Sequence, residues 1–204
     1  MVSAGTFHVV ATELAVGTIA LAGVMISLRL ILSFREKHPS RLSELCDGTS
    51  LVCVVAGLCA LPFAIITGVL AAPGDGLDNP LLFNKMLLSW IGIGLFSAWF
   101  YGRFSMGPNL WNYRPAAIIQ GLIGLAACGS ILTVASMGGK FTRGESLMGP
   151  MSRPLEYSIE LSTTSSILVL IVSVAALVSV LKLMPQPYII EFDDNSLGDS
   201  EGIN

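Results

Sequence analysis

Five long apolar runs limit what this chain can fold into. They lie near residues 9–32, 51–72, 81–101, 116–137 and 157–184. A helix of about 20 apolar residues crosses the ~30 Å hydrocarbon layer of a bilayer, because all of its backbone hydrogen bonds are made within the helix. The sequence therefore predicts an all-α integral membrane helix bundle with about five transmembrane helices over residues 1–187. Residues 188–204 are acidic and rich in Ser, Gly and Asn, which predicts a flexible C-terminal tail.

The composition supports a membrane protein and argues against one class of partner. Hydrophobic residues make up 53% of the chain and charged residues only 12%, about half of their share in soluble domains. The surplus apolar side chains must face lipid, so we expect a surrounding lipid bilayer and bound lipid. The formal net charge of -3, with acids gathered at the C-terminus, argues against a nucleic-acid partner, which would require a basic patch.

Basic residues in the short loops predict the orientation. Arg35, Lys37 and Arg41 lie between the first and second runs, and short loops of this kind stay in the cytoplasm. In the cytoplasmic membrane, this orientation puts the N-terminus outside and the C-terminal tail in the cytoplasm. The loop 136–150 then lies outside, although it carries basic residues of its own, which the same rule disfavours.

Two kinds of side chain near the cytoplasmic ends of the runs suit the membrane interface. Arg29 is expected to extend its long side chain to the headgroups. Trp99, Tyr101 and Trp111 fit an aromatic belt at the same level.

Small residues at four-residue spacing predict where helices touch. Helices in lipid associate by close packing, which small side chains allow. Gly23 and Ser27 form one such pair, and Ala117 and Gly121 form another.

Polar side chains gather at the outer ends of the runs. An ionisable residue at the centre of a membrane helix costs roughly 2.5–3.5 kcal/mol, so a deep one favours a functional role. His8 and Glu13 belong to the first run. The polar outer cluster would be completed by Asn84, Lys85, Glu156 and Glu160. Two interpretations remain open: a proton, metal or quinone-headgroup site, or interfacial side chains that reach lipid headgroups and pair with nearby basic residues.

Familiar catalytic motifs are missing from the sequence. The chain has no phosphate-binding loop, no H-E-x-x-H and no C-x-x-C-H. Only His8 of its two histidines lies on the outer side, so a bis-His haem between the helices of one chain is excluded. The four cysteines are better explained as small apolar residues in helix packing than as metal ligands. We therefore assign no catalytic residue and no metal ligand, and take His8 and Glu13 as the candidate cofactor-binding residues.

Three short stretches carry a family resemblance. The first begins at His8 as H-V-V-A-T-E-L-A-V, where the family has H-P-x-x-V-H-F-P-I-A. The second is Asn84-Lys85, where the family has His followed by Arg or Lys. The third begins at Ala135 as A-S-M-G-G-K-F-T-R-G, where the family has G-H-x-G-G-x-L-T-H-G. Over residues 8–149 the chain resembles an uncharacterised family of multi-helix membrane proteins, a domain of unknown function with some relatives fused to c-type cytochrome domains.

The resemblance implies a helical fold and an association with redox membranes. It also implies that ligands have been lost, because the family's histidine positions hold Glu13, Asn84, Ser136 and Arg143 here, and only His8 remains. A degenerate, non-catalytic subunit would lose such ligands while it kept the glycines that pack its helices.

These features predict an accessory or structural subunit of a larger membrane complex, either redox or respiratory or a copper membrane monooxygenase. Such a chain would not be an enzyme by itself and would bind no cofactor, with haem or metal supplied by the other membrane subunits. One alternative is a membrane cytochrome or quinone-reactive protein that uses His8, Glu13 and a methionine. Another is a small-solute or proton carrier that uses Glu160 and the polar residues 162–166.

The outer loop 136–150 predicts where partner subunits bind. It is rich in glycine and in charged residues, and its candidate partner-binding residues are Lys140, Arg143 and Glu145. We expect a shaped, charged surface for a partner rather than a ligand-binding loop.

Overall fold

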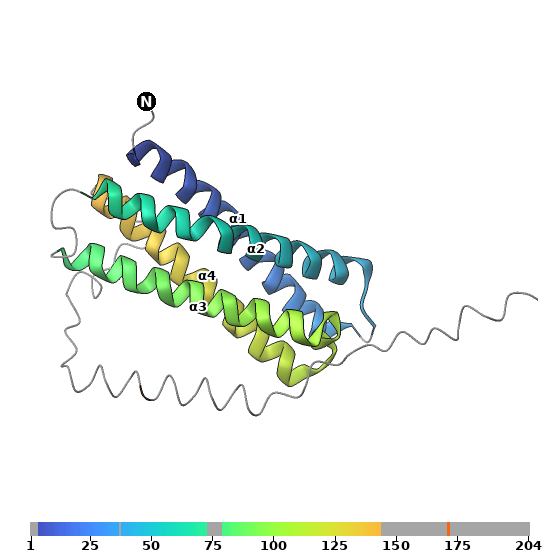
Figure 1. Cartoon of the computed structure of the whole chain (residues 1–204). Coiled ribbons are helices and arrows are strands. Elements are labelled where there is room, and N and C mark those ends of the chain that lie inside the picture. Colours follow the sequence, from blue (N-terminus) through green and yellow to red (C-terminus); the bar gives the residue numbers. More distant parts are fainter. Residues whose placement is uncertain (1–3, 37, 73–78, 144–170, 172–204) are drawn as a thin grey trace, which may run out of the picture. The chain divides into compact units, whose positions relative to one another are not determined.

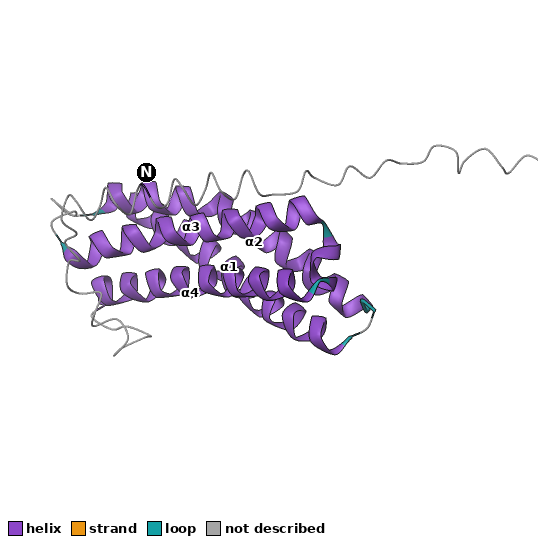
Figure 2. Ribbon diagram, turned by 90° about the horizontal axis from the view of Figure 1, so that it is seen from below, coloured by secondary structure: helices purple, strands orange, loops and turns teal. Residues whose placement is uncertain are grey.

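Four long α-helices form the part of the chain that the structure describes. The computed structural model describes residues 4–36, 38–72, 79–143 and 171, and all but the last lie in one compact unit, Met1–Leu161. The elements in chain order are α1 (Ala4–Arg35), α2 (Arg41–Ala71), α3 (Pro80–Met106), the short 3₁₀ helix η2 (Pro108–Asn112) and α4 (Arg114–Arg143) (Figure 1). Within these residues there is no strand (Figure 2).

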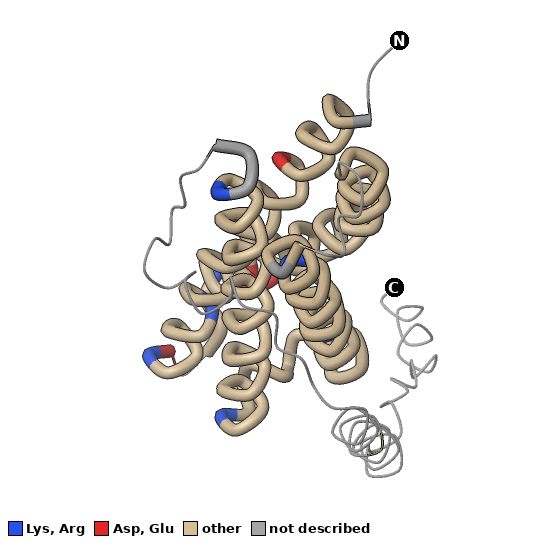
Figure 3. Tube along the Cα trace, turned by 90° about the vertical axis from the view of Figure 1, so that its left-hand side faces the viewer, with Lys and Arg blue, Asp and Glu red and all other residues tan. Residues whose placement is uncertain are grey.

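The prediction of a membrane helix bundle is confirmed for its first four spans. Each of the four helices is long and apolar enough to cross a membrane. Charged residues are sparse along the helices (Figure 3). The predicted fifth span at 157–184 and the tail at 188–204 lie outside the described residues.

One helix begins well before its predicted apolar run. α2 starts at Arg41 rather than near residue 51, because Ser40 caps it: the Ser40 Oγ accepts a hydrogen bond from the backbone N–H of Ser43 at 3.2 Å. The ten extra residues add almost three turns at about 3.6 residues per turn. These turns carry polar residues that would otherwise have been assigned to a loop.

The helix α4 continues beyond its predicted end. Residues 136–143 are helical, so the prediction that the loop begins at Ser136 was wrong. Gly138 does not make a turn there. A Cβ added to it would lie 3.1 Å from Lys85 Nζ, so the missing side chain instead leaves room for a side chain of α3.

The core lies between all four helices, and each of them contributes buried side chains to it. α1 packs against α2 and α4, and α3 packs against α4. Ile26, Phe96, Trp99 and Ile131 are among the largest fully buried side chains of this cluster. Large apolar side chains also remain exposed on each of these helices, Phe63 of α2 among them, as expected for faces that contact lipid.

Glycines let α4 approach its neighbours, as the four-residue spacing predicted. A Cβ added to Gly23 would lie 3.1 Å from Cys128 Sγ, and one added to Gly121 would lie 2.6 Å from Leu30 Cδ2. Ala117 is fully buried beside them. α1 and α4 therefore meet through small residues from both helices.

The predicted aromatic belt was wrong for two of its three members. Tyr101 is 47% exposed, but Trp99 is 0% and Trp111 1% exposed. The turn at Gly107 explains Trp111. Its φ of 63° suits glycine, and the chain turns there from α3 into η2, which buries Leu110 and Trp111.

Two glycines of α4 test this packing. A Cβ added to Gly124 would lie 2.8 Å from Ile26 Cδ1 and 2.9 Å from Trp99 Cδ1, whereas one added to Gly129 meets nothing within 4 Å. We expect Gly124→Ala to lower stability by about 1–3 kcal/mol through overpacking. Gly129→Ala should be neutral or raise stability by up to about 1 kcal/mol through helix propensity. Thermal unfolding of both variants in detergent measures this, and equal melting temperatures would contradict the packing described.

Candidate functional site

A buried carboxylate joins three elements at one end of the bundle. We call this end, which holds residues 29–36, 38–50 and 99–117, the Arg35 end. Asp47 of α2 is only 5% exposed. Arg103 Nε of α3 donates to both of its carboxylate oxygens, at 2.8 and 3.0 Å, and Arg103 Nη2 donates to Oδ2. Trp111 Nε1 of η2 donates to Oδ1 at 2.7 Å. Asp47 therefore accepts from three N–H groups, in the paired geometry that makes arginine–carboxylate bonds strong.

A second arginine lies against the same tryptophan. The Arg29 guanidinium of α1 is 5.3 Å from the centre of the Trp111 ring, a cation–π distance. Arg29 is 4% exposed, and its Nε has no hydrogen-bond partner among the described residues. The prediction that Arg29 extends to the membrane interface was wrong. Arg29 is buried because the turn at Gly107 places Trp111 of η2 against its guanidinium.

The local sequence explains how these side chains are brought together. Asp47 lies in the second turn of α2, on a helix face where Ser43, Cys46 and Ser50 are also buried. Arg103 lies in the last turn of α3, where a cation also interacts favourably with the helix dipole. Sequence analysis missed Asp47 because it assumed that α2 began later. Its signal was available: small and polar residues at 43, 46, 47 and 50 follow helical spacing.

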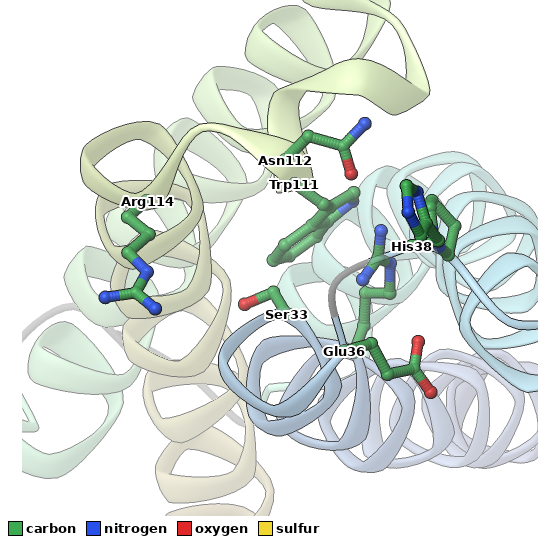
Figure 4. A pocket seen from close by; sticks show the side chains of 8 residues that line it. Ser33, Glu36, His38, Trp111, Asn112 and Arg114 are labelled. Atoms are coloured by element: carbon green, nitrogen blue, oxygen red, sulfur yellow. The ribbon is translucent and has the colours of Figure 1, made fainter.

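A polar cavity of about 190 Å³ lies beside this network. Ser33 and Glu36 line it from the end of α1 and the residue that follows, Asn112 from η2, and Arg114 from the start of α4 (Figure 4). Its lining is completed by Arg29, His38, Pro39 and Trp111. The cavity thus collects side chains from α1, α4 and the two connections at the Arg35 end.

Glu36 organises the connection between α1 and α2. Its carboxylate accepts hydrogen bonds from the hydroxyls of Ser40, at 2.7 Å, and Ser43, at 2.9 Å, and from the Ser40 backbone N–H at 3.1 Å. These hydrogen bonds, first of all the one from the Ser40 hydroxyl, lower the pKa of Glu36 below its ordinary value of 4.5. The ionised carboxylate therefore holds the start of α2.

The predicted cofactor-binding residues lie toward the other end of α1, in different surroundings. The His8 Nδ1 is 2.9 Å from the Ala64 carbonyl oxygen and 3.3 Å from Thr67 Oγ1, so the imidazole bridges α1 to α2. Gly68 leaves room for this ring. Glu13 is exposed. The structure therefore does not show the two side chains sharing a site.

The predicted polar outer cluster is described only in part. Lys85 is close enough to His8 to act on it electrostatically, and its Nζ approaches Gly138. Asn84 is buried on the same helix. Lys140 is half-buried near the end of α4. The predicted residues that lie outside the described part are Glu145, Glu156, Glu160 and the side chain of Arg143.

The cysteines and the acidic residues of the described part form no metal centre. No group of three His, Cys, Asp or Glu side chains within 4–36, 38–72 and 79–143 could hold a metal ion. The four cysteines are free, and three of them, Cys46, Cys53 and Cys128, are buried in the bundle, in keeping with their predicted packing role.

Removing one partner of the Asp47 network should be far more harmful than replacing the pair. Asp47→Leu leaves Arg103, whose side chain is only 12% exposed, without its anion and should lower the free energy of unfolding by about 3–5 kcal/mol. The double variant Asp47→Leu/Arg103→Met should recover much of this loss, since two apolar residues need no partner. Trp111→Phe, which keeps an aromatic ring for Arg29, should lose about 1.5–3 kcal/mol with the hydrogen bond to the carboxylate. Thermal or denaturant unfolding in detergent gives the values. A double variant as unstable as Asp47→Leu would contradict the ion-pair argument.

The Glu36 cap predicts a pH dependence. Because its folded pKa is lowered, Glu36 contributes stability that is present above the ordinary value of 4.5 and lost as pH falls through the lower folded pKa. The difference in melting temperature between the natural protein and Glu36→Gln should therefore shrink as the pH is lowered from about 6 toward about 3, a range that includes the ordinary pKa. A difference that stays constant over this range would mean that the Glu36 carboxylate does not cap α2.

Comparisons with known proteins add no relative on which to base a function. Neither a scan against protein-family models nor searches of curated proteins and solved structures found a match to this chain. The family resemblance therefore stays a prediction. The function must be argued from the arrangement of the residues themselves.

Proposed function

We propose that this chain is a non-catalytic helix-bundle subunit of a larger membrane complex. The observation that carries the proposal is the use made of the charged and ligand-type side chains. Asp47 and Arg103 bind each other across α2 and α3, and His8 contacts the α2 backbone. Side chains that would bind a cofactor or substrate in a catalytic bundle are here used to hold helices together.

The large apolar surface supports the same proposal. α3 has only 22% of its most apolar 18-residue stretch buried within the described bundle, and α2 has 28%. Side chains such as Val52, Phe63, Trp90 and Phe104 are exposed on these helices. Such faces contact lipid in a lone bundle and suit neighbouring transmembrane helices in a complex, because both surroundings are apolar.

The setting of the complex rests on the sequence. The resemblance to relatives fused to c-type cytochrome domains favours a redox or respiratory complex in the cell membrane, and a copper membrane monooxygenase is a second setting. The positive-inside rule places the Arg35 end in the cytoplasm. The candidate partner-binding residues remain Lys140, Arg143 and Glu145, at and just beyond the end of α4.

Native membranes test the proposal directly. We expect the chain, solubilised in a mild detergent, to migrate on a native gel well above its own mass of 21.6 kDa and to co-purify with other membrane proteins. Arg143→Glu should reduce co-purification at least severalfold with little change in the melting temperature of the isolated chain. Arg41→Glu, a charge reversal at the opposite end of the bundle, is the matched control and should leave co-purification unchanged. A chain that migrates alone at its own mass would contradict the proposal.

A further inference from the structure

The cavity at the Arg35 end holds an arginine whose hydrogen-bonding capacity is not fully used. Arg29 is 4% exposed, and its Nε is buried with no partner among the described residues. Almost all buried polar groups in proteins are hydrogen-bonded, so a buried orphan donor beside a polar cavity points to an occupant that accepts hydrogen bonds. The nearest acid of the ion-pair network, Asp47, is already taken by Arg103 and Trp111.

The charges around the cavity favour an anion. Arg29 and Arg114 contribute two positive charges. Glu36 contributes one negative charge, but its oxygens accept hydrogen bonds from Ser40 and Ser43. The neighbouring Asp47–Arg103 pair is neutral as a whole. The cavity therefore carries a net positive charge and offers the donors of two guanidinium groups.

The size of the cavity and its depth in the membrane narrow the choice of anion. A volume of about 190 Å³ holds about six waters at ~30 Å³ each, enough for a tetrahedral oxyanion. α1 has 32 residues and is about 48 Å long at ~1.5 Å per residue, so about 9 Å extends past each side of a ~30 Å hydrocarbon layer when the excess is shared equally. Arg29 lies six residues, or about 9 Å, before the end of α1. Arg29 is then at the edge of the hydrocarbon layer, and the cavity, which Ser33 and Glu36 also line, extends from there into the headgroup layer.

We propose that this cavity binds a phosphate group, attracted by the positive charges of Arg29 and Arg114 in its lining. Arginine suits this ligand because its planar fork of N–H donors matches phosphate oxygens. The phosphate comes either from the headgroup of an anionic phospholipid or from free phosphate in solution. The site is independent of whether the chain is a subunit, because all of its residues belong to this chain.

The test uses the full chain in a neutral detergent and two probes. Native mass spectrometry measures binding of phosphatidylglycerol, with phosphatidylcholine as the zwitterionic comparison. A thermal-shift titration measures binding of inorganic phosphate against chloride at equal ionic strength. Arg114 is exposed at the first residue of α4, so Arg114→Gln and Arg114→Glu should fold normally. Arg41→Gln and Arg41→Glu are matched controls, because Arg41 is exposed at the same end and does not line the cavity.

We expect Arg114→Gln to weaken binding at least roughly tenfold, the loss expected when a charged hydrogen-bond donor is removed, and Arg114→Glu to abolish it. Both Arg41 variants should stay within about twofold of the natural protein, as is usual for an exposed charge outside a site. Binding of phosphatidylglycerol alone supports the site with lipid as the source, and binding of inorganic phosphate alone supports it with a soluble source. Binding of neither probe, or equal losses in the Arg41 and Arg114 variants, would overturn the proposal.

Discussion

The buried carboxylate of Asp47 is the constraint on which the Arg35 end of the bundle depends. A buried charge costs several kcal/mol unless it is fully paired. The donors that pair it come from α3 and η2, through Arg103 and Trp111. Trp111 in turn supports Arg29 of α1. Asp47 is therefore stable only when the residues after α3 have turned at Gly107 and packed beneath the bundle, which ties four elements to one arrangement.

The rest of the bundle is held by close approach rather than by charge. Lipid is as apolar as a helix face, so the hydrophobic effect drives helices together only weakly within a membrane, and van der Waals packing must supply the contact. Gly121 and Gly124 of α4 let Leu30 and Ile26 of α1 lie against the helix backbone. Specific charge pairing at one end and small-residue packing along the helices act together. The first fixes which elements meet, and the second fixes how closely they approach.

These two means of assembly are the features on which the proposed subunit role rests. Among the ionisable side chains of the described part, Asp47 and Arg103 join helices, and Arg29 and Arg114 line the polar cavity. The bundle is joined by hydrogen bonds where its charges meet and has exposed apolar side chains on its helix faces. Its contribution to the proposed complex would come from those faces and from the end of α4, whereas the proposed phosphate site would hold the Arg35 end against the headgroup layer.

The sequence by itself determined the class of fold, because long apolar runs have no stable alternative to transmembrane helices. It also located close contacts at Gly23 and Gly121, since helical spacing puts small residues on one face. Only the tertiary structure decided the site. Arg103 lies 56 residues after Asp47 in the chain and Trp111 lies 64 residues after it, so no local sequence pattern pairs them. Arg29 and Trp111 were expected at the membrane interface because no local sequence pattern shows that they contact each other. Their burial depends on the turn at Gly107, whose effect appears only once η2 has packed against α1.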